Sequence, residues 1–90
     1  MFTVSMQAAR MIRDLIDRAH LPAGAGLRIA RRDDHPALAM TLAAEPGHDD
    51  QVCVEHGAPI FLGPAAAERV VDQTLDGQIT DSNSAFYLRD

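Results

Sequence analysis

The stretch GAGLRIARRDDHPALAMTLAAE, residues 24–45, carries two runs of alternating apolar residues on either side of a charged centre. The apolar members of the two runs are Leu27, Ile29, Leu38, Met40 and Leu42. Alternation with a period of two is typical of half-buried β-strands, and the central Arg-Arg-Asp-Asp-His-Pro contains residues that favour turns. The stretch therefore predicts a β-hairpin whose tip spans residues 31–36.

A helix is predicted on the N-terminal side of this hairpin, over residues 3–19. Its apolar residues recur at helical spacing, and either Thr3 or Ser5 can cap its start. We expect the helix to end before the hairpin, because Pro22 cannot continue a helix and Gly24 favours a turn.

Further strands and a second helix are predicted on the C-terminal side of the hairpin. Strands are expected over residues 52–55, 58–62, 75–79 and 85–88, and a short helix over residues 63–72, with Gly63 at its cap and Pro64 at its first position. The order is one helix, four strands, a second helix and two strands. It predicts one α+β domain over residues 1–90, with a mainly antiparallel, mixed β-sheet or sandwich, an N-terminal amphipathic helix and a second short helix.

For two of the expected strands, the sequence predicts which residues point toward the core. Val52 and Val54 in the first, and Ile60 and Leu62 in the second, alternate with other residues and are predicted to point inward. Pro59 predicts that the second strand is an edge strand or begins there, because proline cannot donate a hydrogen bond to a sheet.

The composition excludes several classes of protein. The net charge is −5, and all eight basic residues are arginines. An acidic chain is a poor binder of nucleic acid. Arg28, Arg31 and Arg32 are interpreted as charges on a solvated strand edge that resist aggregation, and a contact with an anion or a partner is the alternative. No apolar run approaches the roughly 20 residues that span a bilayer, and the N-terminal stretch lacks the apolar core of a signal peptide. We expect a cytoplasmic protein.

The sequence predicts no enzyme. Ser5, Ser82 and Ser84 lack the glycine-flanked context of a catalytic serine, and no glycine-rich loop precedes a lysine. The GAG at residues 24–26 precedes a predicted strand, whereas a dinucleotide site needs glycines that open a helix.

Several residues, in their order and spacing, carry a resemblance to a known family. These are Thr3 before an amphipathic helix, GLRI at 26–29, DQV at 50–52, Gly57 between two strands, a short helix after IFL at 60–62, LDG at 75–77 and Phe86 in the last strand. In this pattern the chain resembles the HesB/IscA family of A-type iron–sulfur carriers over nearly its whole length. The resemblance implies a HesB/IscA-like fold, a role related to iron–sulfur cluster assembly, and contacts with other assembly proteins.

The resemblance also implies which residues to look for. The family holds its cluster with three cysteines, one in the loop after the GLRI strand and two in a Cys-Gly-Cys pair beyond the last strand. Here the loop carries Asp33, Asp34, His35 and Pro36, and the printed sequence ends at Asp90 without that pair. Cys53 is the only thiol, and it lies where the family has an ordinary strand residue. We therefore expect that the chain represents a branch of the family with a degenerate cysteine motif, and that it holds no resident cofactor.

Two clusters of side chains could nevertheless bind a metal. Asp33, Asp34 and His35 share one loop, and imidazole and carboxylate groups are common ligands of divalent cations. The alternative is a polar hairpin tip in which aspartate and proline set the turn. The segment HDD, residues 48–50, forms a similar cluster in the next turn, and it could help only if the fold or a dimer brings the two turns together.

Cys53 and His56 form the other candidate. On a strand, Cys53 and Glu55 point to one face and His56 to the other, so joint chelation needs a turn that begins at His56. Cys53 can instead be a small apolar residue that fills the core, or it can ligate an iron–sulfur cluster shared across a dimer.

Three functions remain open on the sequence alone. The first is a HesB/IscA-like protein that acts through protein contacts and holds no cluster on its own cysteines. The second is a metal-binding or metal-sensing module that uses the histidines and nearby aspartates. The third is a structural homodimer or partner-binding scaffold, since a chain of 90 residues has a small core that self-association would enlarge.

Overall fold

The computed structural model describes residues 1–32 and 35–90. Along this part of the chain, the elements are β1 (Thr3–Val4), α1 (Met6–Arg18), β2 (Gly26–Arg31), β3 (Leu38–Ala43), β4 (Gln51–Glu55), β5 (Ala58–Leu62), α2 (Pro64–Arg69), β6 (Thr74–Ile79) and β7 (Ser84–Arg89). The α+β class with mixed sheets is confirmed. No helix among these residues is long and apolar enough to cross a membrane.

The hairpin predicted from residues 24–45 forms one side of a sheet with the strand order β3-β2-β5-β4. β2 pairs with β3 antiparallel, in a register that runs from Gly26 opposite Ala43 to Arg31 opposite Leu38. β2 pairs with β5 in parallel, and β4 returns antiparallel along β5. β5 is therefore a central strand, and Pro59 stands near its start, as one of its two predicted positions requires.

A second sheet joins the two ends of the chain. Its order is β1-β6-β7, with β1 parallel to β6 and β6 antiparallel to β7. Thr3, predicted in the helix, lies instead in β1, where its hydroxyl is 2.7 Å from that of Thr74. Ser5 is the helix cap, because its Oγ accepts a hydrogen bond from the Ala8 amide at 3.0 Å. β1 has only two residues and forms because it pairs with β6, 71 residues away. No local pattern in the sequence indicates this strand.

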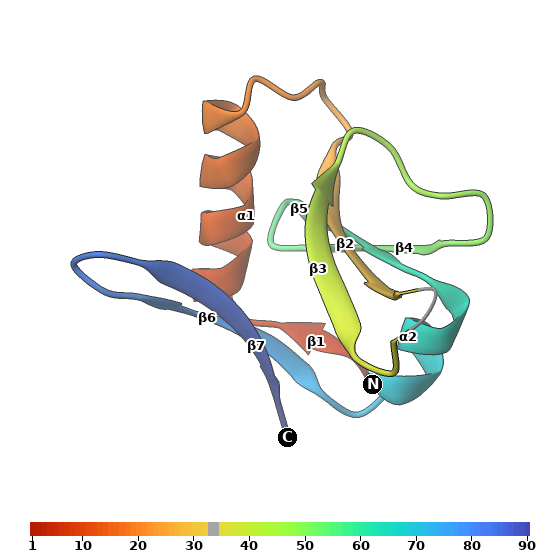
Figure 1. Cartoon of the computed structure of the whole chain (residues 1–90). Helices are drawn as coiled ribbons and strands as arrows, with labels where there is room; N and C mark the ends of the chain where they lie inside the picture. Colours follow the sequence, from red (N-terminus) through yellow and green to blue (C-terminus); the bar gives the residue numbers. More distant parts are fainter. Residues whose placement is uncertain (33–34) are drawn as a thin grey trace.

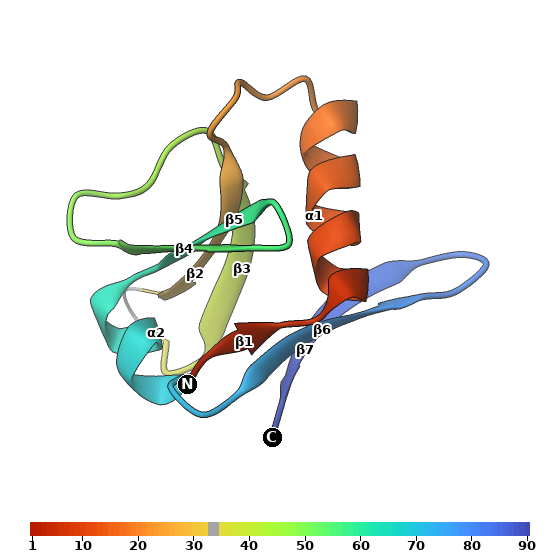
Figure 2. The ribbon, with the colours of Figure 1, turned by 180° about the vertical axis from the view of Figure 1, so that it is seen from behind.

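The core lies where α1 meets both sheets. Figures 1 and 2 show α1 standing beside the four-stranded sheet and over the three-stranded one. Helix α2 packs against β2 and β5. The buried cluster consists of Val4, Ala8, Ala9, Ile12, Leu27, Ile29, Ala58, Ile60, Leu62, Ala66, Val70 and Leu75. Burial of this apolar surface is the main force that holds helices and sheets together.

The faces of β4 and β5 differ in part from the prediction. Ile60 and Leu62 point inward as expected. Val52 and Val54 do not, because 51% and 64% of their surfaces are exposed, while Cys53 between them packs against the core cluster. The prediction of the inward face of β4 is wrong, because the larger apolar residues of this strand lie on its outer face.

The carboxylate of Asp76 links α1 to the β6–β7 pair. It accepts hydrogen bonds from Ser5 Oγ at 2.7 Å, from the Gly77 amide at 2.8 Å and from Arg89 Nε at 3.0 Å. These bonds, with the one from Ser5 contributing most, lower the pKa of Asp76 to about 2. Because the pKa is lower in the folded state, the carboxylate adds stability above pH 4 that is lost as the pH falls toward 2.

We therefore expect Asp76→Asn to flatten the acid limb of the stability curve. Between pH 4 and pH 2, the free energy of unfolding of the variant should fall less steeply than that of the wild type. Urea unfolding at a series of pH values measures both slopes. Asp81→Asn, at the exposed β6–β7 turn, removes the same charge and serves as the control. Equal acid slopes for wild type and Asp76→Asn would contradict the assignment.

Candidate functional site

The first candidate site is the tip of the β2–β3 hairpin. Asp33 and Asp34 lie outside the described residues, so only His35 of the three predicted ligands can be placed. The His35 side chain is exposed, and its Nδ1 accepts a hydrogen bond from the Ala37 amide at 3.2 Å. The tip is tied to α2, because Arg69 Nη1 donates to the Pro36 carbonyl at 2.5 Å. His35 can therefore offer a metal its Nε2 alone while this bond is kept.

Cys53 and His56 lie on a different part of the sheet. Cys53 is opposite Ile60, which is opposite Leu27 in β2. Cys53 is therefore two strand spacings across the sheet from Leu27, and Arg31 lies four residues farther along β2. Together these two displacements place Cys53 about 16 Å from Arg31, at the base of the tip. β4 runs antiparallel to β2, so His56 lies farther still from the tip.

Within the pair itself, the turn that joint chelation needs does begin at His56. That residue has φ 51° and opens the β4–β5 turn with Gly57. Cys53 is half-buried and packs against the core, whereas His56 is exposed. Among residues 1–32 and 35–90, no three His, Cys, Asp or Glu side chains gather closely enough to hold a metal ion.

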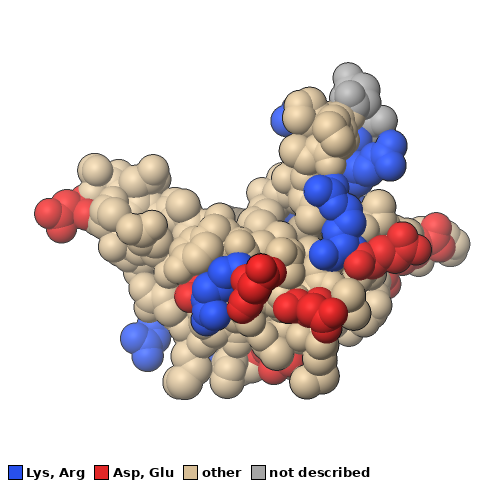
Figure 3. All heavy atoms as spheres, turned by 90° about the horizontal axis from the view of Figure 1, so that it is seen from below, with Lys and Arg blue, Asp and Glu red and all other residues tan. Residues whose placement is uncertain are grey.

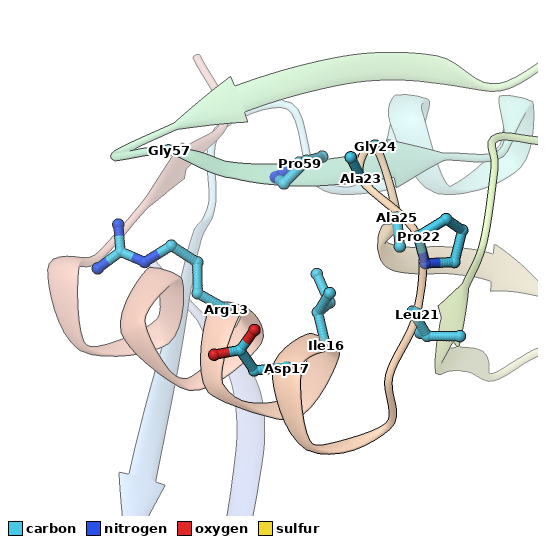
Figure 4. A pocket seen from close by; sticks show the side chains of 10 residues that line it. All are labelled: Arg13, Ile16, Asp17, Leu21, Pro22, Ala23, Gly24, Ala25, Gly57 and Pro59. Atoms are coloured by element: carbon cyan, nitrogen blue, oxygen red, sulfur yellow. The ribbon is translucent and has the colours of Figure 1, made fainter.

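The structure adds a cleft at the end of the sheet opposite the tip. Its volume is about 380 Å³, and its walls come from α1, the α1–β2 loop and the β4–β5 turn. Figure 4 shows Ile16 pointing into the cleft toward Ala23 and Pro59, with Arg13 and Asp17 along its helical side. Arg13 also donates a hydrogen bond to the His56 carbonyl. This cleft is an open hollow with a mixed polar and apolar lining, and it has a cation and an anion along its helical side.

An ion pair on the outer face of the sheet was not predicted from the sequence. Arg28 Nε and Nη2 donate to the Asp50 carboxylate at 2.7 and 3.0 Å, and the Gly47 amide donates to it at 2.7 Å. The bonds from Arg28 lower the pKa of Asp50, while burial of this side chain acts in the opposite direction. Asp50, the last residue of the HDD cluster, has a side chain that is only 1% exposed.

This ion pair binds the β3–β4 loop to the sheet. Arg28 therefore does not stand on a solvated strand as predicted, and it belongs to a central strand. Arg28 and Asp50 are 22 positions apart in the sequence. Nothing in the sequence distinguishes a turn aspartate that forms an ion pair from one that does not. The sequence signal that could have indicated a partner is the position of this arginine between two apolar residues of a predicted strand.

Charges of both signs are interspersed over the face seen from below. Figure 3 shows arginine and acidic side chains next to one another on this face, which is hollowed between its two projecting lobes. One pair on the β6–β7 sheet is Arg89 and Asp76, which are 3.0 Å apart. Several of the arginine side chains lie close together on one of these lobes, and acidic side chains lie next to them.

The whole backbone is similar to three solved structures. SufA from Escherichia coli, described as involved in the biosynthesis of iron–sulfur clusters, has a TM-score of 0.76 and 24% identity over 99% of this chain and 84% of its own. IscA with a 2Fe–2S cluster has a TM-score of 0.73 and 21% identity over 100% of this chain and 85% of its own. A protein from Aquifex aeolicus has a TM-score of 0.76 and 20% identity over 99% and 90%.

Comparisons at the level of sequence give no match. No protein-family model and no curated protein matches the chain. The structural similarity extends over almost every residue, both helices and both sheets. The chain therefore has the HesB/IscA-like fold that SufA and IscA share, as the order of its motifs predicted.

Proposed function

We propose that this protein takes part in iron–sulfur cluster assembly through contacts with other proteins and does not carry a cluster on its own cysteines. The observation that carries the proposal is a fold similar to that of SufA over 99% of the chain, combined with a β2–β3 tip that contains no thiol. We also propose that it works in the cytoplasm and is not an enzyme.

The placement of the single thiol supports this proposal. Iron–sulfur clusters are held mostly by cysteine thiolates, and Cys53 lies about 16 Å from the base of the tip. The side chain of Cys53 packs against the core, and Gln51 Nε2 lies 3.9 Å from its sulfur. A cluster on Cys53 would have to find its other ligands near the edge strand β4. The hairpin tip is too far away to supply them, and its sequence contains carboxylates and one imidazole but no thiol.

Anaerobic reconstitution with iron and sulfide tests the first half of the proposal. We expect no stable visible chromophore and no stoichiometric iron and sulfide after desalting, because the chain has one half-buried thiol. IscA treated in parallel serves as the positive control. A chromophore with stoichiometric iron and sulfide that disappears in Cys53→Ala would overturn the proposal and assign the cluster to Cys53.

Binding to a cluster-loaded carrier tests the second half. The fluorescently labelled chain is titrated with IscA that holds its 2Fe–2S cluster, and the cluster absorbance is followed at the same time. We expect saturable binding without transfer of the cluster to this chain. An unrelated acidic protein of similar size serves as the control. Absence of saturable binding would contradict a role through contacts with this carrier.

A further inference from the structure

The cleft between α1 and the β4–β5 turn has the size of a site for a small molecule. Its volume is about 380 Å³, and pockets that bind small molecules measure about 300–1,000 Å³. The cleft lies near the lower end of this range, which favours a compact ligand. Its lining comes from three segments that are distant in the sequence, so the tertiary structure holds its walls together.

The helical wall of the cleft carries a cation and an anion that do not pair with each other. Arg13 and Asp17 are one turn apart on α1, about 6 Å along its axis, a spacing at which such residues can form a salt bridge. Among the described residues, the salt bridge within this helix joins Arg18 to Asp14 at 3.1 Å, and Arg13 and Asp17 form none. Both side chains are exposed, so a ligand can reach each charge separately.

A contact with the backbone holds Arg13 apart from Asp17. The Nη1 atom of Arg13 donates a hydrogen bond to the His56 carbonyl in the β4–β5 turn, and Figure 4 shows the side chain extending toward Gly57. Gly57 has φ 79°, and a Cβ there would lie 3.2 Å from Nη1, so glycine permits both the turn and this close approach. A guanidinium group has five N–H groups, and the bond to His56 uses one of them.

Apolar side chains lie across the cleft from these charges. Ile16 packs against the core on one side and points into the cleft toward Pro59. Leu21 and Pro22 line the cleft from the α1–β2 loop. A ligand that contacts both Arg13 and Asp17 therefore has apolar surface within reach for the rest of its structure.

From this arrangement we propose that the cleft binds a small zwitterion with an apolar side chain, of the class of the aliphatic α-amino acids. The ligand carboxylate accepts hydrogen bonds from Arg13, its ammonium group donates to Asp17, and its side chain contacts Ile16. Charge complementarity carries the choice of ligand. An anion without an ammonium group would meet the like charge of Asp17, and a cation without a carboxylate would meet that of Arg13.

Titration with leucine, followed by the amide resonances of the protein in NMR spectra, tests the proposal. We expect saturable shifts at residues 13–17, 21–25 and 56–58, with a dissociation constant of about 1 mM, as for a small ligand in an open cleft. Glycine has both charges but no side chain, so it should bind at least about tenfold more weakly.

Ligands that lack one charge test the two polar contacts separately. N-acetylleucine has no ammonium group and leucinamide has no carboxylate, so each should bind about tenfold more weakly than leucine. In Arg13→Gln, leucine should bind no more tightly than leucinamide. In Asp17→Asn, leucine should bind no more tightly than N-acetylleucine.

Two variants on the same helix serve as matched controls. Arg10→Gln and Asp14→Asn remove the same charges from exposed residues outside this cleft, so both should keep the preference for leucine. Circular dichroism checks that all four variants keep the fold.

Three results would each overturn the proposal. They are the absence of saturable shifts with leucine up to about 10 mM, shifts confined to residues outside the cleft, and leucinamide or N-acetylleucine binding to the wild type as tightly as leucine. These outcomes are independent of the role in cluster assembly.

Discussion

Replacing Phe61 with alanine is expected to lower the free energy of unfolding by about 3–5 kcal/mol. Phe61 is 1% exposed although it points to the opposite side of β5 from Ile60 and Leu62, which face the core. In the register it lies beside Arg28, whose ion pair with Asp50 holds the β3–β4 loop on the same face. Truncation would leave a cavity under that loop.

A loss of this size is a large part of the total stability, which is about 5–13 kcal/mol for a domain of 90 residues. Urea unfolding followed by circular dichroism measures the difference. Val71→Ala serves as the control, because its exposed side chain should change stability by no more than about 0.5 kcal/mol. A loss below about 1 kcal/mol for Phe61→Ala would show that this face of β5 is not packed as described.

Replacing Gly26 with alanine should cost about 3 kcal/mol by a different mechanism. A Cβ at this position would lie 2.5 Å from the Pro59 carbonyl oxygen, 2.9 Å from its carbon and 3.0 Å from Phe61 Cζ. The carbonyl belongs to the backbone of a central strand, so it cannot turn aside as a flexible side chain can. β2 and β5 would have to separate at the start of their parallel pairing.

Gly24→Ala separates this clash from the general cost of losing a glycine. Gly24 has φ +93°, and a Cβ there meets no atom within 4 Å, so only backbone strain of about 1 kcal/mol is expected. Thermal and urea unfolding of both variants give the comparison. Equal losses at the two positions would contradict the close approach of Gly26 to Pro59.

The hairpin and the central packing could be predicted because their signals are local. Leu27 and Ile29 alternate with Arg28 and Ala30, and this period of two determines which side of β2 is buried. Gly63 and Pro64 begin α2 as their positions at a helix start require. Each of these signals lies within one element and depends little on the rest of the chain.

The same rule predicted the inward residues Ile60 and Leu62 of β5, but it did not predict that the other face of β5 is buried or which face of β4 points inward. Alternation identifies the inward face only when one side of a strand is solvated, and β5 is buried on both sides at Ile60 and Phe61. In β4 the larger apolar residues are outside, and the smaller Cys53 faces the core. Sequence periodicity carries no information about which neighbour covers a given face.

The candidate site depended even more on contacts between distant residues. His35 and Cys53 are both chemically suitable ligands, but only the strand order shows that they stand on separated parts of the sheet. The cleft beside Ile16 combines three segments, and the Arg28–Asp50 pair joins residues 22 positions apart. Such sites require the topology before they can be recognised.

The parallel pairing of β1 with β6 has a consequence for synthesis on the ribosome. Thr3 and Thr74 are separated by 71 residues, which a ribosome adds in about 4–14 s at its usual rate. During that interval β1 has no partner strand, and the side of α1 that packs on β6 remains uncovered. The three-stranded sheet can form only after β6 and β7 have emerged, so it is completed later than the four-stranded sheet, whose strands are all synthesised earlier.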